Sequence, residues 1–285
     1  MKKLNKYIAY YSIAVTLITI SHSCTERINM DLNSTRTHCV IYGQITTDTT
    51  AHKVRVTKSA DYFSNKPAEP ISGAILTISD GTNIFPLTES STESGSYFTS
   101  SDVYGEVGKT YTLNVSNVDL LGDGNLTSYT ASSEIKPVSN IDSILTVFNE
   151  SYKLWSVNAW AKDPAETEDY YMFLTRINGV LYTDSLSNLA VTEDKFYNGS
   201  YTNGIPCYMF AEKDTIKVGY DVTLEICAIT KDYFHFISEA QTMINPQNPL
   251  FSGPPANVRT NLNNDAIGYF AAYSKSSCTR KVTHK

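Results

Sequence analysis

Apolar and polar residues alternate along much of the chain. The clearest examples are residues 111–116 (YTLNVS) and 222–228 (VTLEICA), in which every second side chain is apolar. Successive side chains of a strand point to opposite faces of a sheet, so this pattern predicts strands with one buried and one hydrated face. Asn178-Gly179, between MFLTRI and VLYT, is a strong hairpin signal because both residues tolerate the positive φ of a tight turn.

One segment has helical periodicity instead. In residues 231–244 (KDYFHFISEAQTMI) the apolar side chains recur at steps of three and four, which predicts a short helix with one apolar face. Those side chains are Tyr233, Phe236, Ile237, Ala240 and Ile244. Thr230 or Asp232 is placed to cap its start. His235 lies beside the apolar face with no other histidine at ligand spacing, so we expect it not to bind a metal.

Strands at short spacing with turns between them favour β-sandwiches over alternating strand–helix units. We therefore expect an all-β chain with two β-sandwich domains in tandem and the short helix packed on the second. The segment around Pro137 interrupts the strand pattern, which places the first domain at residues 36–135 and the second at 138–276. Residues 277–285 form a predicted tail.

The longest stretch without periodicity runs from Asn245 to Asp265. Long structureless loops are uncommon in compact domains and are usually functional or disordered. Four prolines restrict this segment and Phe251 gives it an apolar anchor, so we predict an ordered surface loop and a candidate contact residue at Phe251.

The two tryptophans, Trp155 and Trp160, stand five residues apart in LWSVNAW. In one continuous strand they face opposite sides of the sheet. Trp155 shares its side with apolar residues and is predicted to lie in the core. Trp160 shares its side with Ser156 and Asn158, so it is either covered by a neighbouring element or part of a contact surface.

Residues 1–23 have the pattern of a secretory signal peptide. Three lysines precede an apolar run of about 14 residues, which ends in small residues. The run is shorter than the ~20 residues that span a bilayer. A short buried helix is the alternative, and it leaves the position of the lysines unexplained.

Two cleavage patterns meet at the end of this segment. Ser21-x-Ser23 fits the small-x-small rule of ordinary signal peptidase. Ser23 before Cys24 also fits a loose lipobox, in which Ser21 and His22 depart from the common form. On the second interpretation Cys24 is the lipidated first residue of the mature protein, and residues 24–35 are a polar tether.

The cysteine count favours lipidation. The chain has five cysteines, and an odd number in an exported protein leaves one unpaired. A lipid on Cys24 leaves Cys39, Cys207, Cys227 and Cys278, which allow two disulfides in an oxidising compartment, with three pairings open. The alternative is that these four are small buried hydrophobes.

The charge balance argues against two classes of partner. The chain has a net charge of −6, and removal of residues 1–23 takes away three lysines and no acid, leaving 20 basic against 29 acidic residues. Nucleic-acid binders and polybasic membrane segments both present basic surfaces. We therefore expect no nucleic acid partner and no electrostatic membrane grip.

No catalytic motif is present in the sequence: it lacks the G-x-S-x-G, H-E-x-x-H and Walker patterns. The acid pairs Glu168-Asp169 and Glu193-Asp194 contain the residue type that glycosidases use. Those enzymes need two carboxyl groups about 5 to 10 Å apart across a cleft, and neighbours in sequence do not indicate that. We expect no catalytic residue, no metal ligand and no cofactor.

Several segments follow one another along the chain: CVIYGQIT, PISGAILTISDG, ESGSYFTS, EVGKTYTLNV, IKPVSNIDSI, DPAETEDYYMFLTRING, DKFYNGSY, VGYDVTLEICAIT and NPLFSGPPANVRTNL. In their order and spacing, these segments resemble the Bacteroidota lipoprotein family catalogued as domain of unknown function 4249. The resemblance covers roughly residues 36–274. The first domain also resembles the transthyretin-like or carboxypeptidase-regulatory sandwich, an immunoglobulin-like β-sandwich, through Gly73-Ala74, Gly95-x-Tyr97 and Gly108-x-x-Tyr111.

The resemblance implies an envelope lipoprotein of the outer membrane, held by a lipid such as palmitate on Cys24, on a periplasmic or surface face that stays open. Family members are often encoded beside TonB-dependent transporters, which implies an accessory role in capturing a small nutrient ligand. No catalytic residue follows from the resemblance. Two other classes stay open: a structural or adhesive surface protein, and a hydrolase whose site no motif marks.

Overall fold

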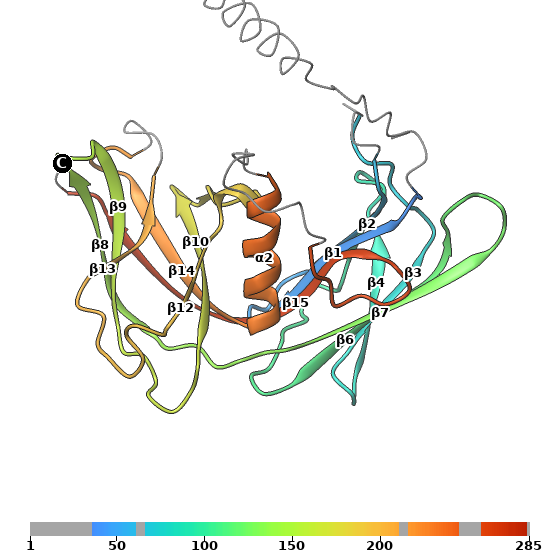
Figure 1. Cartoon of the computed structure of the whole chain (residues 1–285), viewed down its shortest axis with the longest axis horizontal. Helices are drawn as coiled ribbons and strands as arrows, with labels where there is room; N and C mark the ends of the chain where they lie inside the picture. Colours follow the sequence, from blue (N-terminus) through green and yellow to red (C-terminus); the bar gives the residue numbers. More distant parts are fainter. Residues whose placement is uncertain (1–35, 61–65, 211–215, 245–257, 284–285) are drawn as a thin grey trace, which may run out of the picture. The chain divides into compact units, whose positions relative to one another are not determined.

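The computed structural model describes residues 36–60, 66–210, 216–244 and 258–283 of the 285-residue chain (Figure 1). The predicted signal peptide, Cys24, most of the predicted tether and Phe251 lie outside the described residues. Residues Thr37–Lys285 form one compact unit.

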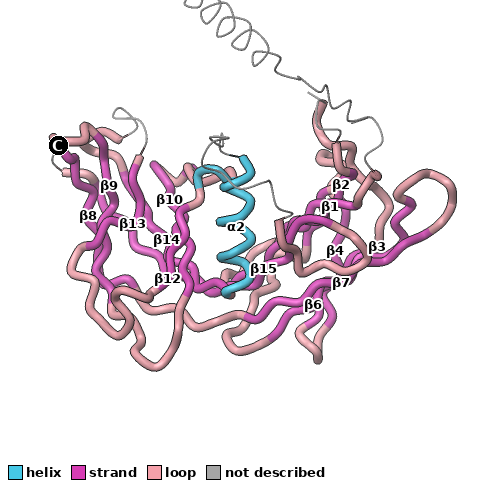
Figure 2. Tube along the Cα trace, in the orientation of Figure 1, coloured by secondary structure: helices cyan, strands magenta, loops and turns pink. Residues whose placement is uncertain are grey.

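The described residues form fifteen strands, one α-helix and one short 3-10 helix, shown by type in Figure 2. In chain order they are β1 (Cys39–Thr46), β2 (Lys53–Lys58), β3 (Ile75–Ser79), β4 (Ile84–Glu89), β5 (Ser96–Phe98), β6 (Thr110–Asp119), β7 (Leu126–Glu134), β8 (Ile141–Asn149), β9 (Leu154–Ala161), β10 (Tyr170–Ile177), β11 (Val180–Leu181), η2 (Leu186–Asn188), β12 (Ala190–Glu193), β13 (Ile205–Met209), β14 (Asp221–Ile229), α2 (Lys231–Ile244) and β15 (Ile267–Lys281).

The strands build one mixed sheet of 12 strands and a separate sheet of three. The large sheet has the order β11-β10-β14-β15-β1-β2-β5-β4-β3-β6-β7, with β12 also paired to β10, and the small sheet has the order β13-β9-β8. The expectation of a mainly β chain with one helix in its second half is confirmed. Both halves of the chain nevertheless contribute strands to the same large sheet, so their hydrogen bonding is not confined to two self-contained sandwiches.

Strand β15 makes this connection. Its first part, Ile267–Tyr273, pairs in parallel with β1, and its second part, Ser274–Lys281, pairs antiparallel with β14. Residues 277–281, predicted as the start of a tail, therefore continue this strand. The predicted domain boundary at residues 135–138 falls between β7 and β8. Strand β15 bonds to strands on both sides of this boundary, and the division into two domains stays a prediction.

The parallel junction requires glycine at position 268. Gly268 has φ +106°, and a Cβ added there would lie 2.1 Å from the carbonyl oxygen of Ile41, its partner in β1. No side chain fits at that distance, and L-residues rarely adopt that φ. The close approach of β15 to β1 thus depends on the absence of a side chain.

Three groups of buried apolar residues form the core. The first group, from β1 to β7, also takes in Leu262, Ala266 and Phe270 from the C-terminal segment. The other two lie on opposite faces of the β10-β14-β15 region: the small sheet covers one face and α2 covers the other. On the predicted hydrated face of residues 222–228, Cys227 is buried in the core with α2, and Glu225 is buried in ion pairs with Arg176 and Lys275. The alternation predicted for residues 111–116 is confirmed.

Helix α2 matches the predicted segment. Thr230 accepts a hydrogen bond from the Tyr233 amide through Oγ1 at 3.3 Å, which caps the start of the helix as predicted. The predicted apolar face is buried except at its end, where Ile244 is exposed. Arg259 in the following loop pairs with Glu239 of α2 at 2.7 Å, so the described end of that loop is held on the helix.

Candidate binding cleft

A cleft of about 880 Å³ lies on the α2 side of the large sheet; we call it the sheet cleft. Its floor comes from β10, β15, β1 and β2, and its walls come from α2 and from residues 181–189. The residues used below to describe it are Tyr42, Gln44, Thr46, Asp48, Lys53, Arg55, Met172, Leu174, Arg176, Leu181, Ser185, Tyr233, Phe236, Tyr273 and Lys275. The floor therefore crosses the β1–β15 junction.

Strand periodicity explains which side chains reach the cleft. Tyr42, Gln44 and Thr46 stand two apart on β1, and Met172, Leu174 and Arg176 stand two apart on β10, so each set projects from one face. Tyr273 and Lys275 follow the same rule on β15.

The polar part of the floor holds a network of ion pairs around Glu225, whose side chain is 8% exposed. The Arg176 Nε donates to Glu225 Oε1 at 2.7 Å, and the Lys275 Nζ donates to Oε2 at 3.1 Å. Lys275 also pairs with Asp48. Burial by itself lowers the pKa of Lys275, but the hydrogen bond to Asp48 and the charge of Glu225 outweigh it and raise the pKa. Lys275 is therefore a fixed positive charge in the floor.

Two tyrosine hydrogen bonds organise the rest of the floor. The hydroxyls of Tyr42 and Tyr233 lie 2.7 Å apart, and the Tyr273 hydroxyl donates to Gln44 Oε1 at 2.7 Å. Burial raises the pKa of all three tyrosines, so they stay neutral at ordinary pH. Tyr42 is 39% exposed and presents an aromatic face to the cleft beside α2.

The sheet cleft thus combines apolar walls with a small number of fixed polar groups. Met172, Leu174 and Phe236 give it an apolar side, whereas Lys53 and Arg55 stand at its polar end, where both pair with Glu93. This mixture is typical of sites for small organic ligands, in which apolar contacts supply affinity and fixed polar groups supply orientation.

The predicted contact residue Trp160 does not line this cleft, and the other, Phe251, lies outside the described residues. Trp155 is buried and Trp160 is half-buried on the other face of β9, as predicted. The indole of Trp160 packs on Gly204: a Cβ added at Gly204 would lie 2.4 Å from its ring. A neighbouring turn thus covers part of Trp160. No local pattern marks the cleft, because its floor joins strands from both ends of the chain.

The four remaining cysteines are free thiols in the structure. Cys39, Cys207 and Cys227 are buried and Cys278 is half-buried, as the alternative of small buried hydrophobes describes. Cys227 pairs across the sheet with Lys275 and Cys278 with Leu224, so the two thiols stand three positions apart along β14 and β15. That offset is roughly 10 Å, beyond the reach of a disulfide.

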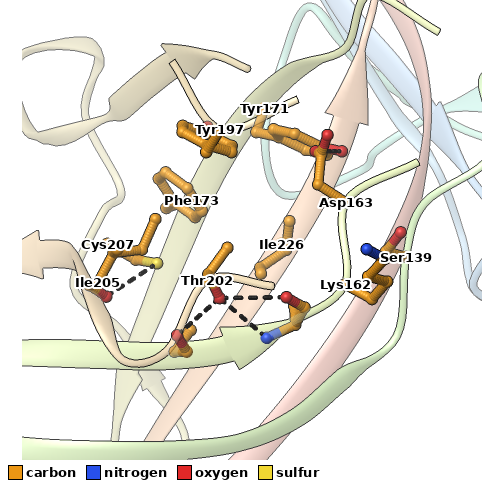
Figure 3. A pocket seen from close by; sticks show the side chains of 12 residues that line it. Ser139, Lys162, Asp163, Tyr171, Phe173, Tyr197, Thr202, Ile205, Cys207 and Ile226 are labelled. Atoms are coloured by element: carbon orange, nitrogen blue, oxygen red, sulfur yellow. Dashed lines mark hydrogen bonds between the residues drawn. The ribbon is translucent and has the colours of Figure 1, made fainter. Parts of the chain in front are cut away.

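A second, smaller cavity of about 30 Å³ lies between the two sheets (Figure 3). Phe173, Cys207 and Ile226 line it, with Asp163 and Tyr171 at one end. Its volume is that of about one water molecule, so it does not hold an organic ligand.

Three carboxylates gather at that end. One oxygen from each of Asp163, Asp169 and Asp194 lies within 4.8 Å of the others, and this is the one such group of histidine, cysteine or acidic residues in the described part of the chain. Burial raises the pKa of Asp169 first, and the charges of Asp163 and Asp194 raise it further. Asp169 and Asp194 come from the two acid pairs noted in the sequence, but their neighbours Glu168 and Glu193 are not part of the group.

Other chemistry is sparse in the described residues. His52 is buried, with Nε2 3.2 Å from the Val103 carbonyl, His38 contacts the Asp265 carbonyl, and His235 touches Phe234. No helix among these residues is both long and apolar enough to cross a bilayer.

The protein is therefore mainly β, and its large sheet carries a cleft large enough for a small organic ligand. The chain belongs to the family described as "Domain of unknown function (DUF4249)", whose model matches residues 25–279. No curated protein matches the chain.

Proposed function

We propose that this chain is a non-catalytic, lipid-anchored binding protein of the outer membrane that captures a small nutrient in the sheet cleft and passes it to a TonB-dependent transporter. In this proposal residues 1–23 are removed, Cys24 bears the lipid, and residues 24–35 tether two sandwich-like halves to the membrane.

The observation that supports capture is the sheet cleft. Its volume of about 880 Å³ falls in the range of small-molecule sites, roughly 300 to 1,000 Å³. The apolar wall at Leu174 and Phe236 favours a ligand with an apolar body. The charged group of Arg176 favours a hydrogen-bonding group on that ligand.

Binding is favoured over hydrolysis by where the acids lie. The group of Asp163, Asp169 and Asp194 adjoins a cavity of about 30 Å³, which is too small for a sugar or peptide substrate. At the sheet cleft, two of the lining residues, Arg176 and Lys275, engage the buried Glu225. An acid held by two cations is poorly suited to general acid or base catalysis.

A matched pair of variants tests capture. Ser185 lines the sheet cleft, whereas Ser187, in η2, does not, and the two hydroxyls form one hydrogen bond of 3.1 Å with each other. Ser185→Trp and Ser187→Trp therefore lose the same bond, but only the first enlarges a side chain that lines the cleft. We expect native mass spectrometry, after incubation with the dialysable fraction of growth medium, to detect a bound small molecule on wild type and Ser187→Trp and at least tenfold less on Ser185→Trp. Equal occupancy of the two variants would place the ligand elsewhere.

A further inference from the structure

The ends of three strands meet at the acidic group. Asp163 follows β9 of the small sheet, Asp169 precedes β10 of the large sheet and Asp194 follows β12. The Asp194 amide donates to the Asp169 carbonyl at 3.0 Å, which fixes two of the three strand ends beside each other. The arrangement belongs to the folded chain, because Asp163 and Asp194 are 31 residues apart in sequence.

The surrounding turn holds the carboxylates in place. The Tyr171 hydroxyl donates to Asp163 Oδ1 at 2.8 Å and the Gly199 amide donates to its Oδ2 at 2.9 Å. The Thr167 hydroxyl donates to Asp169 Oδ2 at 2.6 Å. These donors are neutral, so they orient the carboxylates without balancing their charge.

One oxygen of the group has no partner. Asp194 is 1% exposed, and its Oδ2 makes no hydrogen bond with any described residue. No ion pair within the described part of the chain involves any of the three acids, and Lys136, whose charge acts on Asp169, is itself paired with Glu134 at 2.7 Å. Buried carboxylates normally have a paired cation, a metal ion or a full set of hydrogen bonds. Two buried carboxylates and one half-buried carboxylate together, with one oxygen unpartnered, offer a set of ligands suited to a cation.

We infer that Asp163, Asp169 and Asp194 form a binding site for one divalent cation, and that the ion is calcium. All three ligands are carboxylate oxygens, which suit calcium, magnesium and manganese and do not suit zinc or copper. Oxygens within 4.8 Å of one another can all ligate one calcium ion at ~2.4 Å, whereas magnesium is usually held by only one or two carboxylates. Water fills the remaining coordination positions.

The ion would join the two sheets. Asp163 belongs to the end of the small sheet, and the other two acids belong to the edge of the large sheet. A shared calcium ion therefore adds an ionic link between elements that also meet through apolar contacts in the second core. An ion that binds only the folded state stabilises that state, and the stabilisation grows as the ion concentration rises.

The experiment uses the full chain in mild detergent, with calcium chloride as the probe. We expect isothermal titration to show one site, and we expect calcium at a hundred times its Kd to raise Tm by about 5 °C over the value in EDTA. Magnesium at the same concentration gives a smaller shift.

Variants separate a cation site from a purely structural cluster. Asp194→Asn abolishes the calcium-dependent shift, yet in EDTA its Tm is equal to or above that of wild type, because one of three repelling charges is gone. Glu193→Gln, the adjacent acid outside the group, keeps the wild-type shift. Asp169→Asn, at the half-buried position, repeats the test if Asp194→Asn does not fold. The inference would be overturned if wild type showed neither a heat of calcium binding nor a calcium-dependent rise in Tm, or if both Asp variants kept the wild-type rise in Tm.

Discussion

Gly268→Ala is expected to lower the free energy of unfolding by about 3 kcal/mol or more, the largest effect of any single substitution considered. Two causes add at this position. The φ of +106° is strained for any L-residue, and the new Cβ would stand 2.1 Å from the Ile41 carbonyl oxygen. The clash is with backbone, so relief requires β15 to move away from β1. That movement opens the first core, which contains Phe270 of β15.

Gly219→Ala is the matched control. Gly219 has φ +93°, but nothing lies within 4 Å of an added Cβ. Only the backbone strain applies there, and we expect a loss of about 1 kcal/mol. Denaturant unfolding of both variants gives the comparison. Equal losses would mean that the β1–β15 junction does not depend on close approach at Gly268.

Glu225→Gln is expected to lower the free energy of unfolding by about 2 to 3 kcal/mol. The substitution leaves the shape nearly unchanged but removes the negative charge between Arg176 and Lys275. Loss of one partner from a buried ion pair usually costs about 3 to 5 kcal/mol, because the other charge stays buried and unpaired. We expect less here, because Lys275 keeps Asp48 and Arg176 is 35% exposed.

Asp221→Asn controls for the loss of charge on the same strand. Asp221 pairs with Lys281 across the same two strands, but the side chains are 51% and 60% exposed. Solvent screens such a pair, so we expect a change below about 1 kcal/mol. Thermal or denaturant unfolding of the two variants at neutral pH is the measurement. If Glu225→Gln lowered the free energy of unfolding as little as Asp221→Asn, the ion pairs around Glu225 would not behave as buried ones. Their charges would then not be fixed in the polar part of the cleft floor.

Local patterns in the sequence predicted local structure well. The apolar steps of three and four in residues 231–244 gave the helix and its four buried side chains, because the helical period depends only on near neighbours. The alternation of apolar and polar residues around Trp155 and Trp160 predicted that the two side chains lie on opposite faces of β9, because the strand period also depends only on near neighbours.

The pairing of strands that are far apart in the sequence could not be predicted from such local patterns. Strand β15 lies beside β1 although Ile267 and Val40 are separated by most of the chain, and no short pattern marks a parallel pair of that kind. The sheet cleft, whose floor includes both strands, was missed with it. The acidic group was missed for a related reason: Asp169 and Asp194 were noted beside Glu168 and Glu193, but their structural partners are each other and Asp163.

The cleft also changes where a ligand is sought. The sequence pointed to exposed aromatic residues, and Trp160 is half covered by the turn at Gly204. The structure points instead to Tyr42 and its neighbours on four strands. In the proposed role, this site is where the anchored protein would capture its ligand.

The most direct test of the proposed role is a pull-down of the protein, at native expression and in mild detergent, with identification of its partners. We predict that wild type is recovered from the membrane fraction with a TonB-dependent transporter. We predict that Cys24→Ala, which has no site for the lipid, is recovered from the soluble fraction without it. A membrane-bound, fully processed Cys24→Ala protein would contradict the anchor, and wild type recovered without a transporter would contradict the account of its function.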